Sequence, residues 1–163
     1  MTPSDETRKL RRTVALLRIV LGVILLATWW DNLQKGLYLQ HGFARFVSGL
    51  ASGHPIAFYR HFLTGVIVPN AALFGTFQLI TELAMGIALL LGLFTPLAGL
   101  GASLFFLNLF LAYLNPNTGE WIWTYVLLLT SAVVVTFTRS GRAWGVDGRL
   151  AQKRGKPPFP FLW

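Results

Sequence analysis

The stretch that decides the fold is Asn70–Leu114, which reads NAALFGTFQLITELAMGIALLLGLFTPLAGLGASLFFLNLFLAYL. It contains one charged side chain, Glu82, and it is interrupted only by a turn at residues 93–96. A helix that crosses a bilayer needs about 20 mainly apolar residues, so the stretch predicts two spans, 70–94 and 97–114. Because the turn between them is short, the two helices should be antiparallel neighbours.

Two more segments, 13–30 and 121–138, are long and apolar enough to cross a bilayer. The last of them ends in a β-branched run, Val133–Thr136, which in water would favour a strand. A single strand cannot satisfy its backbone hydrogen bonds inside a bilayer, so we predict a helix there too. The predicted fold class is an all-α membrane protein, a four-transmembrane-helix bundle.

The composition of the whole chain supports a membrane protein. Of its 163 residues, 54% are hydrophobic and 12% are charged, and the mean hydropathy is +0.57. Soluble domains are about 45–50% apolar and about 25% charged. The chain has no cysteine, which excludes a disulfide scaffold, thiol catalysis, a Cys-ligated zinc or iron–sulfur site and a haem attached through cysteines.

The net charge is +8, and the positions of the basic residues indicate the membrane topology. Eleven of the fourteen Lys and Arg residues lie on the side of the two termini, ten of them outside the spans and Arg18 near the inner end of the first span. The positive-inside rule therefore predicts that both termini are cytoplasmic. Such flanking charges also argue against a nucleic-acid partner, which would need a basic face. Tryptophans at the other end of the spans are expected to form an aromatic belt at the outer interface: Trp29, Trp30, Trp121 and Trp123.

Residues 31–69 are too many for a turn and too apolar for a solvated loop. Phe43 and Val47 recur at helical spacing, and so do Tyr59 and Leu63. We predict an extracytoplasmic cap of two amphipathic helices between the first two spans. Residues 1–148 are then one transmembrane domain, and 149–163 a basic cytoplasmic tail. Four tail residues are candidates for docking into a partner subunit: Pro157, Phe159, Phe161 and Trp163.

The candidate catalytic residue is Glu82, which lies near the middle of its span. A carboxylate there costs at least about 2.5–3.5 kcal/mol on insertion scales, which favours a functional role. Gln78 lies one turn away on the same face, and Asn108 should reach the same depth on the next helix and approach Glu82. Tyr125 is expected at a similar level. These polar groups predict either a proton-accepting pocket for a quinone or substrate, or interhelical hydrogen bonds that hold the bundle.

The remaining polar residues give weaker signals. Arg18 lies near the inner end of its span, from which it can snorkel to the cytoplasm; the alternative is an ion pair or a head-group anchor on that side. Arg60 and His61 are framed by aromatic residues in the cap, which suits a quinone head group, an anionic sulfur species or a solvated helix face. The three histidines match no zinc spacing, and no span holds a haem-ligating histidine or a nucleotide loop, so we expect no metal, haem or nucleotide.

Four stretches of the chain resemble the DoxX/DoxD family of small membrane proteins. Residues 81–95, TELAMGIALLLGLFT, are similar to the family pattern G-E-L-x-x-G-x-x-L-L-L-G-L-x-T, with Thr81 in place of the first glycine. Residues 140–147, SGRAWGVD, resemble its closing G-R-x-x-G-L-D, with Val146 in place of leucine. Residues 17–22 resemble its opening, and the segment 55–62 resembles the DoxD-like branch in particular.

The resemblance implies a four-helix integral protein of the prokaryotic inner membrane. Its DoxD branch is associated with quinone-linked oxidation of thiosulfate, together with a separate partner subunit. The first hypothesis is therefore a quinone-interacting subunit of a thiosulfate:quinone type oxidoreductase, which depends on its partner for electron transfer. The alternative is a non-catalytic accessory or assembly subunit of a larger respiratory or photosynthetic membrane complex. A small carrier or channel is a weaker third hypothesis, because the chain has no evident internal repeat.

Overall fold

The computed structural model describes residues 3–154 and Leu162. All regular elements in that part of the chain are helical, which confirms the predicted all-α class. Four long helices form the bundle: α1 (Pro3–Gln34), α4 (Ala71–Leu91), α5 (Thr95–Ala112) and α6 (Trp123–Thr138). Shorter elements complete the fold: α2 (Gln40–Ala51), α3 (Ala57–Phe62), η1 (Leu63–Ile67), η2 (Val68–Asn70), η3 (Pro116–Thr118), η4 (Ser140–Arg142) and α7 (Val146–Arg154).

The bundle helices lie over the four predicted spans. Three helical stretches have the length and hydropathy to cross a membrane, namely Asp5–Gln34, Ala57–Leu91 and Thr95–Ala112, while Trp123–Thr138 is apolar but shorter. Large apolar side chains cover the outside of the bundle, including Leu16, Val20, Leu73, Ile80, Leu100, Leu127 and Phe137. An apolar exterior of this kind is stable only in lipid. The chain is a multi-pass membrane protein.

Small residues let the bundle helices approach closely. A Cβ on Gly22 of α1 would lie 2.6 Å from the backbone nitrogen of Leu90, and one on Gly86 of α4 would lie 2.8 Å from the Leu26 side chain. On α5, a Cβ at Gly99 would lie 2.6 Å from Oγ1 of Thr136. These glycines of α4 and α5 therefore face other helices, as is typical of helix packing in membranes.

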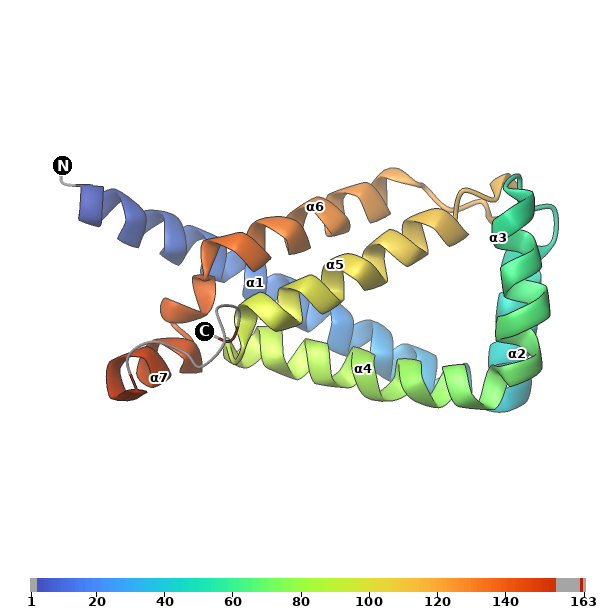
Figure 1. Cartoon of the computed structure of the whole chain (residues 1–163), viewed down its shortest axis with the longest axis horizontal. Helices are drawn as coiled ribbons and strands as arrows, with labels where there is room; N and C mark the ends of the chain where they lie inside the picture. The colour runs from blue at the N-terminus through green and yellow to red at the C-terminus, as the bar shows by residue number, and fades with distance from the viewer. Residues whose placement is uncertain (1–2, 155–161, 163) are drawn as a thin grey trace.

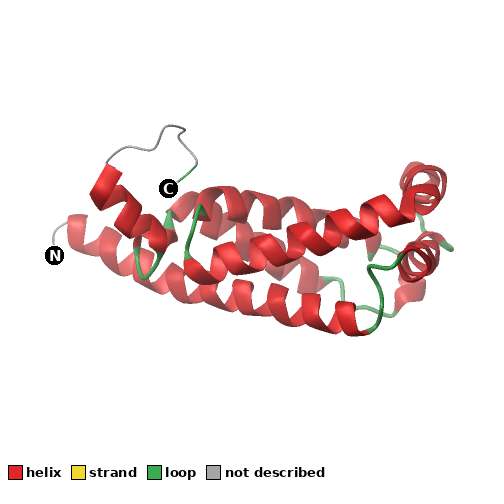
Figure 2. Cartoon of the chain, turned by 90° about the horizontal axis from the view of Figure 1, so that it is seen from below, coloured by secondary structure: helices red, strands yellow, loops and turns green. Residues whose placement is uncertain are grey.

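The cap lies across one end of the bundle. Figure 1 shows α2 and the α3–η1 segment running roughly perpendicular to α4, and Figure 2 shows the same segments nearly end-on. Two amphipathic helical segments are present between the first two spans, but the second continues through η1 and η2 into α4 without a loop. Pro69 lies in η2, where the chain turns from the cap into the bundle. The first bundle helix also extends to Gln34, beyond the predicted boundary at residue 30.

The end opposite the cap holds both the N-terminus and α7 (Figures 1 and 2). The expectation that Arg18 snorkels to water is wrong, because its side chain is fully buried. Its guanidinium donates to the carbonyl oxygens of Ser140 (3.3 Å) and Trp144 (3.1 Å). The negative charge of Asp147 lies close enough to act on it. This corresponds to the alternative of an ion pair on the side of the termini.

Asp147 also fixes the start of α5. Its carboxylate accepts from the backbone N–H groups of Phe94 (2.7 Å) and Thr95 (2.9 Å), which lack intrahelical partners. Its own N–H donates to the carbonyl of Gly92, which has a positive φ of 64°. The closing motif is thus a clasp between the turn after α4 and the segment after α6. Because α7 runs from Val146 to Arg154, the expected boundary at 148/149 falls inside a helix.

The four tail residues proposed for partner docking lie outside the described residues.

Candidate functional site

The site is built on one face of α4. Gly75, Gln78, Glu82 and Gly86 are three or four residues apart, so they form a single stripe along the helix. Gly75, Glu82 and Gly86 are buried. A Cβ on Gly75 would lie 2.5 Å from the carbonyl oxygen of Tyr38, so the missing side chain lets the connection after α1 pack directly on α4. That approach brings the Tyr38 ring down beside the stripe.

Glu82 is fully buried and is held by two donors. The hydroxyl of Tyr38 donates to Oε2 at 2.8 Å, and Nε2 of Gln78 donates to the same oxygen at 3.4 Å. The other carboxyl oxygen, Oε1, has no hydrogen-bond partner among the described residues. A buried polar atom without a partner is rare and costly, which marks this oxygen as a candidate for a ligand or a proton.

Tyr38 remains a hydrogen-bond donor at neutral pH. Burial raises the pKa of Tyr38, and the hydrogen bond to Glu82 and the charge of that carboxylate raise it further. A hydrogen bond with the side chain of Asn32 opposes these effects. The polar groups therefore form a chain from the half-buried Asn32 through Tyr38 and Glu82 to Gln78.

A cavity of about 440 Å³ is lined by residues of α2, α3, η1, α4 and α5; we call it the cap cavity. Figure 1 shows that α4 and α5 diverge toward the cap. Its lining is mainly aromatic and aliphatic: Phe43, Phe46, Val47, Leu50, Phe62, Leu63, Ile67, Phe74, Phe77, Met85, Gly101, Leu104, Phe105, Leu109 and Ala112. The polar lining residues are Tyr59, Gln78, Thr81 and Asn108. Phe77 is 62% exposed and Leu104 is 60% exposed, so the cavity borders the lipid-facing surface between α4 and α5.

Gln78 and Asn108 both face this cavity, from α4 and α5. The Tyr59 hydroxyl, on the cap, donates to Oδ1 of Asn108 at 3.0 Å. The expected approach of Asn108 to Glu82 does not take the form of a hydrogen bond among the described residues. Gln78 instead stands between the cavity and Glu82, because it lines the first and donates to the second.

Three other expected site residues lie elsewhere. Tyr125 is in the first turn of α6 and stacks on Tyr113, with ring centroids 4.6 Å apart and planes 7° apart. It lies at the cap end of α6, whereas Glu82 lies near the middle of α4, so its expected depth beside Glu82 is wrong. Arg60 and His61 are exposed on α3 and are not part of the cavity lining. Arg60 donates to the carbonyl of His54 at 3.5 Å.

His54 anchors the cap. Its Nδ1 accepts from the N–H of Ile56 at 3.2 Å, so Nε2 carries the proton and donates to the carbonyl of Leu111 at 2.9 Å. His41 and His61 are exposed. Within residues 3–154, no group of three His, Asp or Glu side chains is arranged to hold a metal ion.

Sequence patterns missed the two tyrosines that complete the site. The sequence indicated Tyr59 only as one apolar position of an amphipathic segment. No sequence pattern indicated Tyr38, because its partner Glu82 is 44 residues away in the chain. Gly75 was the available clue, since a glycine on a buried stripe permits another backbone to come close.

Comparison with known proteins supports the resemblance drawn from the motifs. No solved structure matches the chain. A family model described as "TQO small subunit DoxD" matches residues 13–158, which is nearly the whole chain. The motifs at residues 81–95 and 140–147 both lie inside that range. The chain therefore belongs to the DoxD family.

Proposed function

We propose that this protein is the quinone-interacting membrane subunit of a thiosulfate:quinone oxidoreductase-like complex, with the quinone ring bound in the cap cavity. The observation that carries the proposal is an aromatic cavity beside lipid with two amides on its wall and a buried carboxylate behind one of them. The family description names a small subunit of such an oxidoreductase, which supports the reaction class.

The residues of the cavity suit a quinone in size and chemistry. Ligand pockets commonly measure about 300–1,000 Å³ and combine an apolar lining with a few fixed polar groups. The cap cavity, at about 440 Å³, lies within that range. The Tyr59 hydroxyl occupies Oδ1 of Asn108, which leaves the Nδ2 amide as a donor toward a ring carbonyl. The lipid-facing border of the cavity gives an isoprenoid chain a route into the bilayer.

Reduction of a quinone to a quinol takes up two electrons and two protons. In our proposal Glu82 holds a proton close to the cavity, at the carboxyl oxygen that has no partner. Tyr38 keeps the carboxyl oriented by its 2.8 Å hydrogen bond, and Gln78 links the carboxyl to the cavity wall. Because the chain has no cysteine, no thiol of its own can relay electrons. The electrons are therefore assigned to a redox group of a partner subunit.

The proposal is tested by titrating the purified protein, in dodecyl maltoside, with decylubiquinone and measuring binding by microscale thermophoresis. We expect saturable binding, and we expect Asn108→Leu to weaken it by about threefold to tenfold, the usual effect of one hydrogen bond. Tyr125→Phe is the matched control, because Tyr125 is also a polar residue of a bundle helix but lies outside the cavity. It should bind as the wild type does.

Absence of saturable binding by the wild type would overturn the proposal. An equal loss of quinone affinity in Asn108→Leu and Tyr125→Phe would also overturn it. If the protein then co-purified with a stoichiometric partner and contained no quinone, the accessory-subunit hypothesis would replace it.

A further inference from the structure

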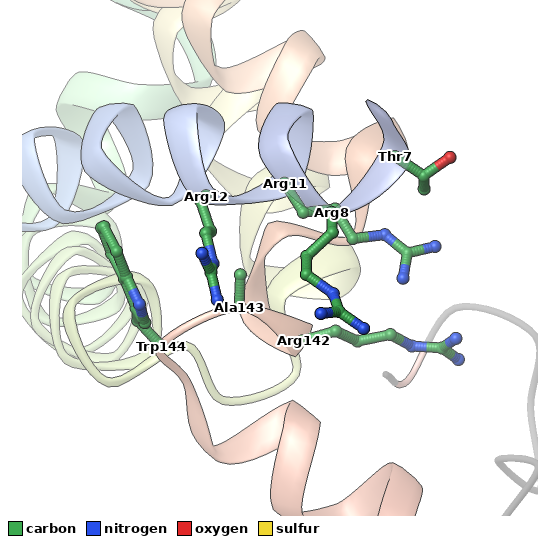
Figure 3. Close-up of a pocket in the computed structure, with 7 residues that line it drawn as sticks. All are labelled: Thr7, Arg8, Arg11, Arg12, Arg142, Ala143 and Trp144. Carbon is green, nitrogen blue, oxygen red and sulfur yellow. The ribbon is translucent and has the colours of Figure 1, made fainter. Parts of the chain in front are cut away.

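A second cavity lies at the end of the bundle that carries both termini. It measures about 590 Å³ and is formed between α1 and the segment that follows α6. Figure 3 shows its lining: Thr7, Arg8, Arg11 and Arg12 from α1, and Arg142, Ala143 and Trp144 from the opposite side. The guanidinium groups of Arg8 and Arg142 point toward the same region, and Arg12 lies between them and Trp144 (Figure 3).

The charge of this cavity is strongly positive. Four of its described lining residues are arginines, and none of the described lining residues is acidic. Burial lowers the pKa of Arg142, and the positive charges of Arg139 and Arg11 lower it further, while Asp147 opposes them. The arginines give this side of the molecule a positive potential, which attracts anions.

The cavity is held in a fixed shape by the clasp described above. Arg18 donates to the carbonyl of Trp144, whose φ of 54° is in the left-handed region that non-glycine residues rarely adopt. Strained backbone of this kind persists only where the surrounding structure imposes it, and it concentrates at functional sites. The indole of Trp144 is 60% exposed, so it is presented at the surface rather than packed in the core.

The position along α1 places the cavity at the edge of the membrane. Arg12 directly precedes the predicted first span, and the nearby Leu10 (two residues earlier) and Leu16 (one turn later) are exposed apolar residues. Arginine binds phosphate oxygens in bidentate fashion, and tryptophan is enriched at the level of lipid head groups. We propose that this cavity binds the phosphate-bearing head group of an anionic phospholipid from the leaflet on the side of the termini.

The test uses the full-length protein in nanodiscs made from phosphatidylcholine with a minor fraction of phosphatidylglycerol. After release into the gas phase, native mass spectrometry counts the lipids retained. We expect selective retention of phosphatidylglycerol, reduced about tenfold in R8Q/R142Q, because each basic residue near the surface contributes to attraction of anionic lipid. R8K/R142K preserves the charge and should restore part of the retention.

The matched control is R149Q/K153Q, which removes the same charge from α7 at the same end of the molecule but not from the cavity. R149Q/K153Q should retain lipid as the wild type does. All three double variants should elute as folded protein in size-exclusion chromatography. Equal loss of lipid retention in R8Q/R142Q and R149Q/K153Q would show that retention depends on total charge alone, and it would overturn the proposal. Displacement of the lipid by millimolar inorganic phosphate would also overturn it, in favour of a soluble phosphate ligand.

Discussion

At the scale of single residues, the two oxygens of the Glu82 carboxyl group have different surroundings, one suited to hydrogen bonding and the other to proton transfer. The two donors Tyr38 and Gln78 reach the same oxygen of the carboxyl group, and the other oxygen has no partner among the described residues. A residue that served packing alone could be an amide, at a lower cost of insertion into the membrane. The higher free-energy cost of placing a carboxyl group in the membrane therefore favours a role in proton transfer.

Glu82→Gln tests the proton role directly. The variant keeps the size of the side chain and an oxygen that can accept from Tyr38, but it cannot take up a proton. We expect quinone affinity to stay near the wild-type value, whereas turnover of the assembled complex falls by about a hundredfold or more, as for loss of a general acid–base group. Glu120→Gln, at an exposed glutamate, is the control. Full turnover of Glu82→Gln at acid and alkaline pH would contradict the proton role.

Asp147 is the second residue whose role is specific. Replacing it by alanine removes the acceptor of two backbone N–H groups at the start of α5. Each buried donor left without a partner costs about 1–3 kcal/mol, so we expect the free energy of unfolding to fall by about 2 kcal/mol or more. The loss of a negative charge near the buried Arg18 adds to this cost.

The measurement is unfolding by sodium dodecyl sulfate in mixed micelles. Asp31→Ala is the control, since it breaks an exposed ion pair with Lys35 that is worth about 0–1 kcal/mol. Equal stability of the two variants would refute the capping role of Asp147.

At the scale of the elements, glycines have opposite roles on α1 and α2. Gly22 lies against the backbone of α4, so Gly22→Ala forces the two helices apart and should destabilise the protein by about 1–3 kcal/mol. Gly49 is exposed on α2 with nothing within 4 Å of its Cβ position. Gly49→Ala should therefore stabilise the cap by about 0.5–1 kcal/mol, as alanine does in a helix interior. The same unfolding assay measures both, and a change of the same sign in both would contradict this packing.

The elements also mark the limit of sequence patterns. Hydropathy located the four bundle helices, and the period of 3.6 residues placed Gln78 and Glu82 on one face, because both depend on one segment alone. Rise per residue gives depth along a helix, but not which neighbour a side chain meets. Arg18 was expected to reach water for that reason, although the segment after α6 closes over it. The tyrosines of the site come from the cap, whose placement depends on contacts distant in sequence.

At the scale of the whole molecule, the two cavities lie at opposite ends of one bundle. The cap cavity is apolar, whereas the cavity between α1 and the segment after α6 is lined by arginines. This difference between the two ends matches the charge distribution of the sequence, in which most Lys and Arg residues lie at the end with the termini. From the positive-inside rule we predict that this end faces the cytoplasm.

The orientation is accessible to cysteine labelling, since the chain has no cysteine of its own. Lys9→Cys lies before the first span, and Asn117→Cys lies in η3 beside the cap. In intact cells a membrane-impermeant maleimide should label Asn117→Cys alone, and lysed cells should label both. Labelling of Lys9→Cys in intact cells would reverse the orientation.

The central claim is that a quinone binds in the cap cavity, and two threonines of α4 test it most directly. Thr81 lines the cavity, whereas Thr76 is exposed and lies outside it; each donates to a carbonyl four residues earlier. Thr81→Trp should fill the cavity and abolish binding of decylubiquinone, while Thr76→Trp should leave its affinity unchanged. Equal binding by the two folded variants would contradict the claim.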